Sequence, residues 1–175
     1  SRGRDRSDSR MSSPEWFTEA RAVPYSVGNL DVDGARIQYR AWGTAGNPVT
    51  VLVHGGAAHA GWWDHVGPLL GGDHRVVAID LSGHGESDHR ADYSLEQWAR
   101  EVMAVAAAES DDAPVIIGHS MGGFVTLTAA REHGPQLRGA AAIDSPVETT
   151  SAETLAWVAR NSNPPAHKVY PDLPS

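Results

Sequence analysis

The residue best suited to do chemistry is a serine that lies between two glycines. Residues 118–122 read Gly-His-Ser-Met-Gly, which matches the pattern G-x-S-x-G. They follow the apolar stretch 114–117 and precede a helical stretch, so we expect a sharp strand-to-helix turn, called the elbow below. Such a turn holds the serine in a strained conformation that small neighbours tolerate, and it exposes the hydroxyl. The pattern therefore predicts Ser120 as a nucleophile; the alternative is a tight turn without chemistry.

Two backbone N–H groups are candidates for stabilising the negative charge that such a nucleophile creates on a carbonyl oxygen. The Met121 N–H lies in the first turn of the predicted helix, and helix N-termini bind anions. The second candidate is Gly56, in a His-Gly-Gly loop that follows the apolar stretch 49–53. Glycine lets a backbone approach a substrate closely. We therefore predict an oxyanion hole at Gly56 and Met121, with a merely flexible glycine turn as the alternative for residues 54–56.

Other side chains near these groups are predicted to contact substrate. We expect a pocket lined by Gly55, His119, Trp62 and Trp63, although packing into the core is the alternative for both tryptophans. Asp144 ends the last recognisable strand and is a candidate acid that orients a histidine. The alternative is a strand-end aspartate bonded to nearby backbone N–H groups.

Two further polar stretches have a structural interpretation. His54 is expected to brace its loop rather than to transfer protons. The glycine-rich loop 80–87 lacks the lysine and the spacing of a phosphate-binding loop, so we expect it to pack beside the elbow.

The elements that must position these residues are visible as hydrophobic patterns. Short apolar stretches predict buried parallel strands at 49–53, 75–79, 114–117 and 137–143. Helices are predicted near residue 14, over 61–70, from Ser94 onwards and over 121–133. The stretches 27–32 and 35–42, joined by Asp-Gly, predict a hairpin. The alternation predicts an α/β fold, with a doubly wound, mostly parallel sheet.

Composition excludes several classes of protein. The 175 residues, 41% of them hydrophobic, are enough for one domain with its own core. The net charge of −8 argues against a nucleic-acid surface, and no stretch is apolar for long enough to span a membrane. The absence of cysteine makes a reducing cytoplasm the default compartment, with export as the alternative. The scattered histidines predict no metal site, and we expect no cofactor.

Taken together, these motifs resemble the α/β-hydrolase superfamily, and most of all its bacterial esterase, haloperoxidase and C–C hydrolase branch. The resemblance covers residues 25–147 and rests on four segments. They are VLVHGG at 51–56, VVAIDLSGHGESD at 76–88, VIIGHSMGG at 115–123 and AAIDSPV at 141–147. It implies a serine hydrolase that acts on an ester or a similar carbonyl substrate, a small molecule.

The resemblance also implies a catalytic acid after the seventh strand and a histidine after the eighth. The sequence predicts a fold truncated after about strand six, so neither position is filled. His133 and His167 follow the elbow but lie elsewhere. We expect a disordered leader at 1–13, the N-terminal part of the core at 14–147 and the start of a partly disordered lid at 148–175. A chain without the base would be inactive or weakly active alone.

Two other functions are compatible with the sequence, and the truncated sheet predicts self-association. The chain is alternatively a non-catalytic ligand-binding or scaffold protein on the same fold, or a cofactor-free haloperoxidase or lyase. Strand six would be an open edge of the sheet, which predicts self-association through that edge.

Overall fold

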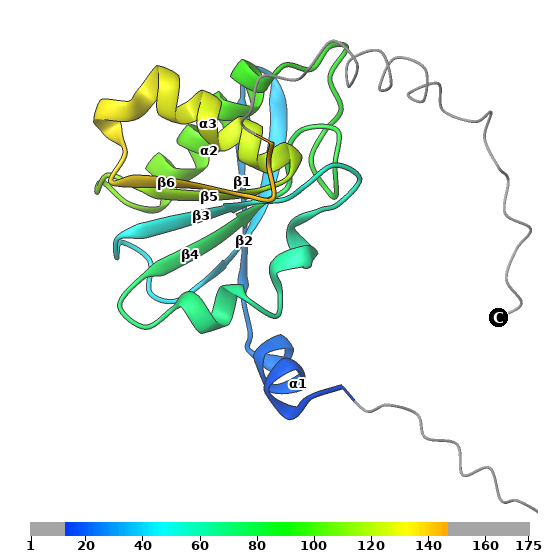
Figure 1. Ribbon diagram of the computed structural model, residues 1–175, viewed down its shortest axis with the longest axis vertical. Coiled ribbons are helices and arrows are strands. Elements are labelled where there is room, and N and C mark those ends of the chain that lie inside the picture. Colours follow the sequence, from blue (N-terminus) through cyan, green and yellow to red (C-terminus); the bar gives the residue numbers. More distant parts are fainter. Residues whose placement is uncertain (1–12, 147–175) are drawn as a thin grey trace, which may run out of the picture. The chain divides into compact units, whose positions relative to one another are not determined.

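A computed structural model describes residues 13–146, which form a six-stranded sheet with helices on both faces (Figure 1). The strands are β1 (Ser26–Val32), β2 (Ala35–Trp42), β3 (Val49–Val53), β4 (Arg75–Ile79), β5 (Val115–His119) and β6 (Gly139–Ile143). The α-helices are α1 (Glu15–Ala22), α2 (Leu95–Glu109) and α3 (Met121–His133). Three short 3-10 helices are η1 (Ala60–Trp63), η2 (Gly67–Leu70) and η3 (Gly134–Gln136). Three predictions lie outside the described residues: the leader except for Ser13, the start of a lid at 148–175, and the position of His167.

The sheet has the order β1-β2-β4-β3-β5-β6. The pairs β4–β3, β3–β5 and β5–β6 are parallel, whereas β1–β2 and β2–β4 are antiparallel. The hairpin turn at Asp33 and Gly34 has positive φ at both residues, as an Asp-Gly turn requires. The predicted α/β fold with a mostly parallel sheet is confirmed.

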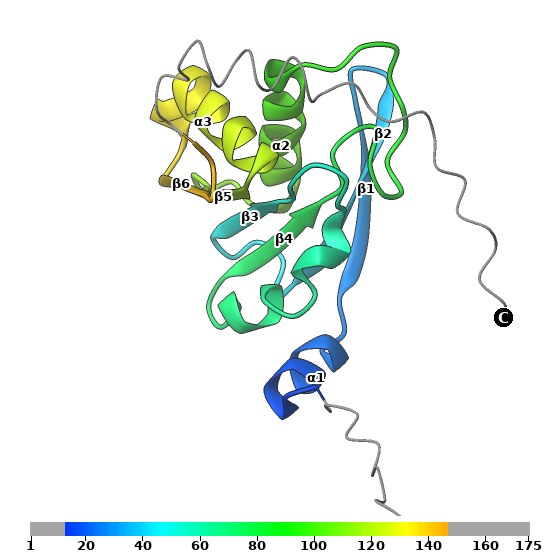
Figure 2. The ribbon, with the colours of Figure 1, turned by 45° about the vertical axis from the view of Figure 1, so that its right-hand side comes forward.

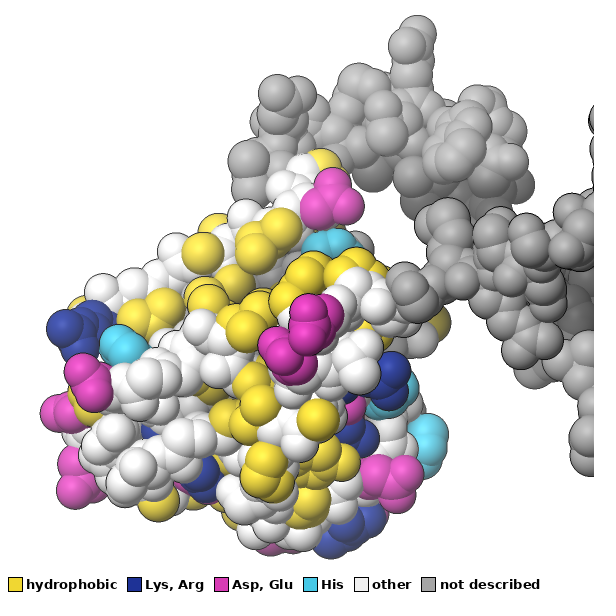
Figure 3. All heavy atoms as spheres, turned by 90° about the horizontal axis from the view of Figure 1, so that it is seen from below, with side chains coloured by type: hydrophobic (Ala, Val, Ile, Leu, Met, Phe, Trp, Pro, Cys, Tyr) yellow, Lys and Arg dark blue, Asp and Glu magenta, His cyan; other side chains and the backbone are white. Residues whose placement is uncertain are grey.

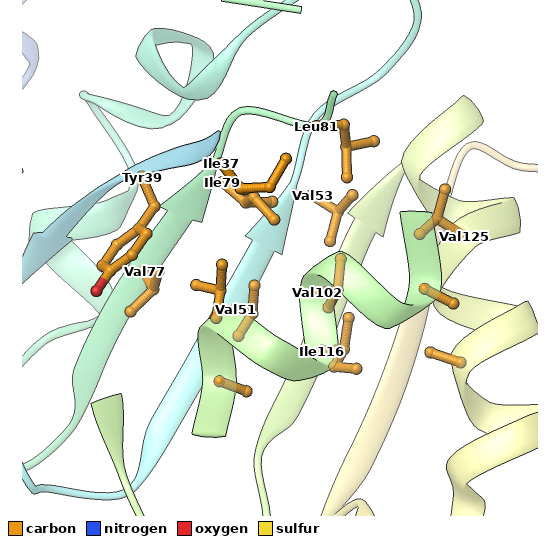
Figure 4. Close-up of a cluster of buried hydrophobic side chains, with 14 of the residues drawn as sticks. Ile37, Tyr39, Val51, Val53, Val77, Ile79, Leu81, Val102, Ile116 and Val125 are labelled. Carbon is orange, nitrogen blue, oxygen red and sulfur yellow. The ribbon is translucent and has the colours of Figure 1, made fainter. Parts of the chain in front are cut away.

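The two faces of the sheet carry different layers. Helices α2 and α3 lie side by side on one face, and η1 and η2 lie on the other (Figures 1 and 2). Alternate residues of the central strands point to opposite sides, so β3 contributes Val51 and Val53 to the core under α2 and α3 and Leu52 to the other core. Figure 4 shows the first core, where Val102 of α2 and Val125 of α3 pack onto the strands. Both faces of the central strands are therefore covered, which explains their continuous apolar sequences.

The predicted helix over 61–70 is wrong: two 3-10 turns, η1 and η2, take its place. Gly67 lies against the ring of Trp42, and a Cβ there would come within 2.6 Å of that ring. The chain must therefore run close to the sheet at Gly67, and Pro68 follows with no N–H to continue a helix.

A buried ion pair joins three segments of the chain. Glu101 of α2 is fully buried; its carboxylate pairs with Arg90 at 2.9 Å and accepts the Ser82 N–H at 2.9 Å. The Arg90 guanidinium also donates to the carbonyl oxygens of Val32 and Asp33 in the hairpin. Helix α2 is thereby tied to the loop after β4 and to the hairpin turn.

The surface near α1 exposes apolar side chains. Figure 3 shows apolar side chains across the middle of the face seen from below, with acidic side chains among them and further charged side chains toward the rim. The exposed large residues on α1 and η2 are Trp16, Leu69 and Leu70. None of the described helices is long and apolar enough to cross a membrane.

Candidate active site

Ser120 occupies the turn between β5 and α3 with φ of 53° and ψ of −116°, a conformation that strains any side chain. Its backbone is bonded on both sides. Its N–H donates to the Ile143 carbonyl at 2.9 Å. Its carbonyl accepts the Gly123 N–H at 2.9 Å and the Ser145 hydroxyl at 2.8 Å. The end of β6 therefore holds the elbow in place.

The glycines of the elbow are required by close backbone contacts. A Cβ on Gly118 would lie 2.0 Å from the Gly122 carbonyl oxygen. A Cβ on Gly122 would lie 2.4 Å from the Val53 carbonyl oxygen, at the end of β3. Neither contact can be relieved by a rotamer change, because the obstacle is backbone. The two glycines thus allow α3 to start directly against β3 and β5.

The loop after β3 is braced by His54. This side chain is fully buried, and burial lowers its pKa from 6.5 to about 4, so it is neutral near pH 7. Its Nε2 accepts the Leu81 N–H at 3.2 Å, which places the proton on Nδ1, and Nδ1 donates to the Gly55 carbonyl at 2.8 Å. Both ring nitrogens are thus bonded to backbone, and the predicted bracing role is confirmed.

The same hydrogen bond orients Gly56. In a planar trans peptide the C=O and the N–H point in opposite directions. Because the Gly55 carbonyl points at His54, the N–H of Gly56 points away from it. Gly56 also lines the pocket beside Ser120, and neither its N–H nor that of Met121 has an acceptor within residues 13–146.

A pocket of about 400 Å³ opens beside the elbow. It is lined by Gly55, Gly56, Ala57, Ala58, His59, Gly61, Trp62, His119 and Ser120. Five of these residues are glycine or alanine. The aromatic part of the lining includes the Trp62 indole, which stacks on the His119 ring with 6.0 Å between centroids and 15° between planes. Three residues predicted to contact substrate, Gly55, His119 and Trp62, thus line the same pocket as Ser120.

Trp63 does not line this pocket. It is 7% exposed and packs with Trp42, Leu52 and Val76 on the sheet, whereas its neighbour Trp62 is 54% exposed. Successive residues of a 3-10 helix point about 120° apart, so the two tryptophans face in different directions. The alternative interpretation, core packing, describes where Trp63 lies.

Asp144 follows β6 with φ of 53°, and its side chain is 86% exposed. Its Oδ2 lies 3.8 Å from Nε2 of His119, and no backbone N–H of residues 13–146 donates to its carboxylate. The carboxylate therefore faces a histidine, although that histidine makes no hydrogen bond with the Ser120 hydroxyl.

The loop 80–87 is structural, as predicted, but within residues 13–146 its hydrogen bonds reach β2, His54, η1 and α2 and none reaches the elbow beside which it was expected to pack. The Asp80 carboxylate is buried and accepts the N–H groups of Ala60, at 2.6 Å, and Glu86, at 3.0 Å. It thereby fixes the start of η1, which carries Trp62, relative to the end of β4.

Backbone strain is concentrated at this site. Among residues 13–146, four non-glycine residues have positive φ: Asp33, Ala57, Ser120 and Asp144. Asp33 is explained by the hairpin turn. The other three are Ser120 itself, a residue of the pocket wall and the residue facing His119. Such conformations persist where a function requires them.

Sequence reasoning did not single out Ala57, His59 or Ser145. The residue type alanine does not indicate the positive φ of Ala57, and the residue type serine does not indicate that Ser145 bonds to the Ser120 carbonyl. His59 lies three positions after Gly56, and this closeness in the sequence could have indicated that it lines the same pocket. No group of three or more metal-ligating side chains is present within the described residues.

The sequence is similar to proteins of the α/β-hydrolase fold family. The sequence matches a family model described as alpha/beta hydrolase fold over residues 48–166. It is 34% identical over 118 residues to a "Serine hydrolase-like protein" of Danio rerio, covering 66% of this chain and 36% of that protein. It is 28% identical over 124 residues to "Epoxide hydrolase 4" of Mus musculus, covering 69% of this chain and 34% of that protein.

Among solved structures, Epoxide Hydrolase A from Mycobacterium thermoresistibile aligns with a TM-score of 0.69 and 26% identity, covering 78% of this chain and 45% of that chain. The chain thus spans about a third of the length of these two curated relatives and less than half of the solved structure.

Proposed function

Since the chain belongs to the α/β-hydrolase fold family, we propose that it holds the nucleophile and oxyanion hole of a serine hydrolase acting on an ester or similar carbonyl compound. The observation that carries the proposal is the conformation of Ser120, strained at a strand-to-helix turn and lining a pocket together with the adjacent glycine loop. The name of the Danio rerio relative, a serine hydrolase-like protein, agrees with it.

In the proposed reaction, the Ser120 Oγ forms a bond to the carbonyl carbon, and the carbonyl electron pair moves onto its oxygen. The N–H groups of Gly56 and Met121 stabilise that oxyanion. When the oxyanion collapses, the bond to the alcohol breaks, and the alcohol departs with the proton from the Ser120 hydroxyl. Water then cleaves the acyl-serine, which releases the acid and restores Ser120.

A base must move that proton, and the described residues do not supply one. Within residues 13–146 no side chain forms a hydrogen bond with the Ser120 hydroxyl, and both nitrogens of His54 are bonded to backbone. A serine without its base loses several orders of magnitude in rate. We therefore propose that the chain alone reacts slowly.

A fluorophosphonate probe tests the proposal on the full chain. We expect slow modification that mass spectrometry places on Ser120, acceleration by free imidazole acting as an external base, and no modification of Ser120→Ala. The matched control is Ser26→Ala, in the edge strand β1, which should be modified at Ser120 as slowly as the wild type. Modification as fast as in an ordinary esterase, without imidazole, would mean that the chain supplies its own base. No modification of Ser120 under either condition would overturn the proposal and favour a ligand-binding protein.

A further inference from the structure

The hydroxyl of Ser145 bonds to the elbow from the end of β6. Its Oγ lies 2.8 Å from the Ser120 carbonyl oxygen and 3.3 Å from that of Ile143. The Ile143 carbonyl in turn accepts the Ser120 N–H at 2.9 Å. The single proton of the Ser145 hydroxyl goes to the nearer acceptor, the Ser120 carbonyl, so both backbone polar groups of the candidate nucleophile are bound to residues 143–145.

Two backbone features bring Ser145 to this place. Asp144 has φ of 53°, which turns the chain back toward the elbow directly after β6. Gly123, in the first turn of α3, leaves the space that the serine fills, since a Cβ there would lie 1.8 Å from the Ser145 Oγ. Gly123 in α3 and Ser145 after β6 thus fit against each other, because only a glycine leaves room for the serine side chain.

The bond has a consequence for the neighbouring peptide. The carbonyl of Ser120 and the N–H of Met121 belong to one planar peptide and point in opposite directions. A donor that fixes the direction of the Ser120 carbonyl therefore fixes the direction of the Met121 N–H. The loop after β3 has the same arrangement, because His54 donates to the Gly55 carbonyl at 2.8 Å and thereby directs the N–H of Gly56.

We propose that Ser145 is a positioning residue of the oxyanion hole: its hydroxyl holds the Ser120 carbonyl and so directs the Met121 N–H, as His54 directs the Gly56 N–H. The proposal rests on the proposed function, since it takes these two N–H groups as the oxyanion donors. It means that a side chain helps to direct each donor by bonding to the carbonyl of the same peptide; at Ser120 the hydroxyl of Ser145 acts together with the Gly123 N–H, which donates to the same oxygen at 2.9 Å. Such preorganisation lets a donor act without reorganising during the reaction.

A boronic acid is a suitable probe, because it forms a tetrahedral adduct with a serine hydroxyl and places an oxygen where the oxyanion would be. Titrations of the full chain with phenylboronic acid, followed by NMR of the Met121 and Gly56 amides, would compare the wild type with Ser145→Ala and Ser145→Thr. We expect Ser145→Ala to weaken binding about 3- to 10-fold, the worth of one hydrogen bond. Ser145→Thr keeps the hydroxyl and should restore binding to within about 3-fold of the wild type.

Ser26→Ala is the matched control. Its hydroxyl also lies near a strand carbonyl, that of Ala41 at 3.3 Å, but at the opposite edge of the sheet, so we expect unchanged boronate binding. Equal binding by wild type and Ser145→Ala would overturn the proposal. So would an equal loss in Ser145→Ala and Ser145→Thr, because the hydroxyl would then not be the group that matters.

Hydrogen exchange of the free protein separates this proposal from the proposed function. We expect the Ser120 N–H to exchange about 3- to 10-fold faster in Ser145→Ala, while amides in the middle of α3 stay unchanged. Failure of boronate to bind the wild type would count against Ser120 as a nucleophile. Faster exchange in Ser145→Ala would still show that Ser145 holds the elbow, and unchanged exchange would overturn its positioning role.

Discussion

Ser120 lies in a backbone region that favours glycine, which costs about 1–3 kcal/mol for a residue with a side chain. Ser120→Gly removes that strain, although glycine adds roughly 0.4–1 kcal/mol of conformational entropy to the unfolded chain. We expect Ser120→Gly to raise the free energy of unfolding by about 1 kcal/mol and the Tm by roughly 2–4 °C in calorimetry. Ser120→Ala keeps the strain and should melt close to the wild type. A Ser120→Gly protein less stable than Ser120→Ala would contradict this account.

His54 makes stability depend on pH, because burial lowers its pKa from 6.5 to about 4. Between these values the unfolded chain binds a proton that the folded chain does not. Stability from this group is therefore complete above pH 6.5 and falls as the pH decreases toward 4, by about 3 kcal/mol in total. Urea unfolding of the wild type and His54→Gln between pH 7 and 4.5 should show a smaller decrease in the variant. His89→Gln, at an exposed position, is the control and should retain the wild-type decrease.

Individual site residues could be predicted from the sequence where the residue type by itself indicates the role. The glycines of the elbow have no good substitutes in that geometry, and the serine between them carries the reactive hydroxyl, so the pattern identifies all three. Trp62 and Trp63 are the same residue type at adjacent positions, and only the local helix type decides which one faces the pocket. Ser145 acts through a hydrogen bond to a residue 25 positions away, which no local pattern reveals.

Two of the three glutamates of helix α2 lie in very different surroundings. Glu101 is fully buried against Arg90, whereas Glu96 forms an exposed pair with Arg131 and is 46% exposed. Glu101→Gln leaves the Arg90 charge without its partner, so we expect a loss of about 3 kcal/mol in the free energy of unfolding. Glu96→Gln should cost less than about 0.5 kcal/mol. Chemical denaturation of both variants checks this, and equal losses would show that the pair does not tie α2 to its neighbours.

Elements that are buried or regularly periodic were predicted well. The strands 49–53 and 75–79, the hairpin strand 35–42 and the helix 121–133 have the predicted bounds, because continuous burial or an uninterrupted period determines their sequences. The apolar residues of segment 61–70 have helical spacing, but the segment forms two 3-10 turns, because Gly67 packs directly against the ring of Trp42 on the sheet. That contact lies between residues far apart in the chain and leaves no local pattern.

The two edges of the described sheet differ in character. Strand β6 reads GAAAI, with no charge and no proline, and its Ile143 is 48% exposed. Strand β1 at the other edge carries Asp31. Natural edge strands are usually guarded by charge, proline or a bulge. We therefore propose that a second copy of this chain pairs with β6.

Sedimentation velocity tests that pairing. We expect Ala141→Lys, which adds a charge to β6, to shift the distribution toward monomer. Val27→Lys adds the same charge to β1 and should leave self-association unchanged. A monodisperse wild-type monomer, or an equal effect of both lysines, would contradict the proposal that β6 is the interface.

The order β1-β2-β4-β3-β5-β6 also determines what a ribosome exposes. The apolar central strand β3 is synthesised before either of its neighbours, and β5 follows it only about 60 residues later. At ~5–20 residues per second, that interval lasts roughly 3–12 s during translation. During that interval the VTVLV segment of β3 can pair with β4 on one side only, and its other edge stays open until β5 has been synthesised.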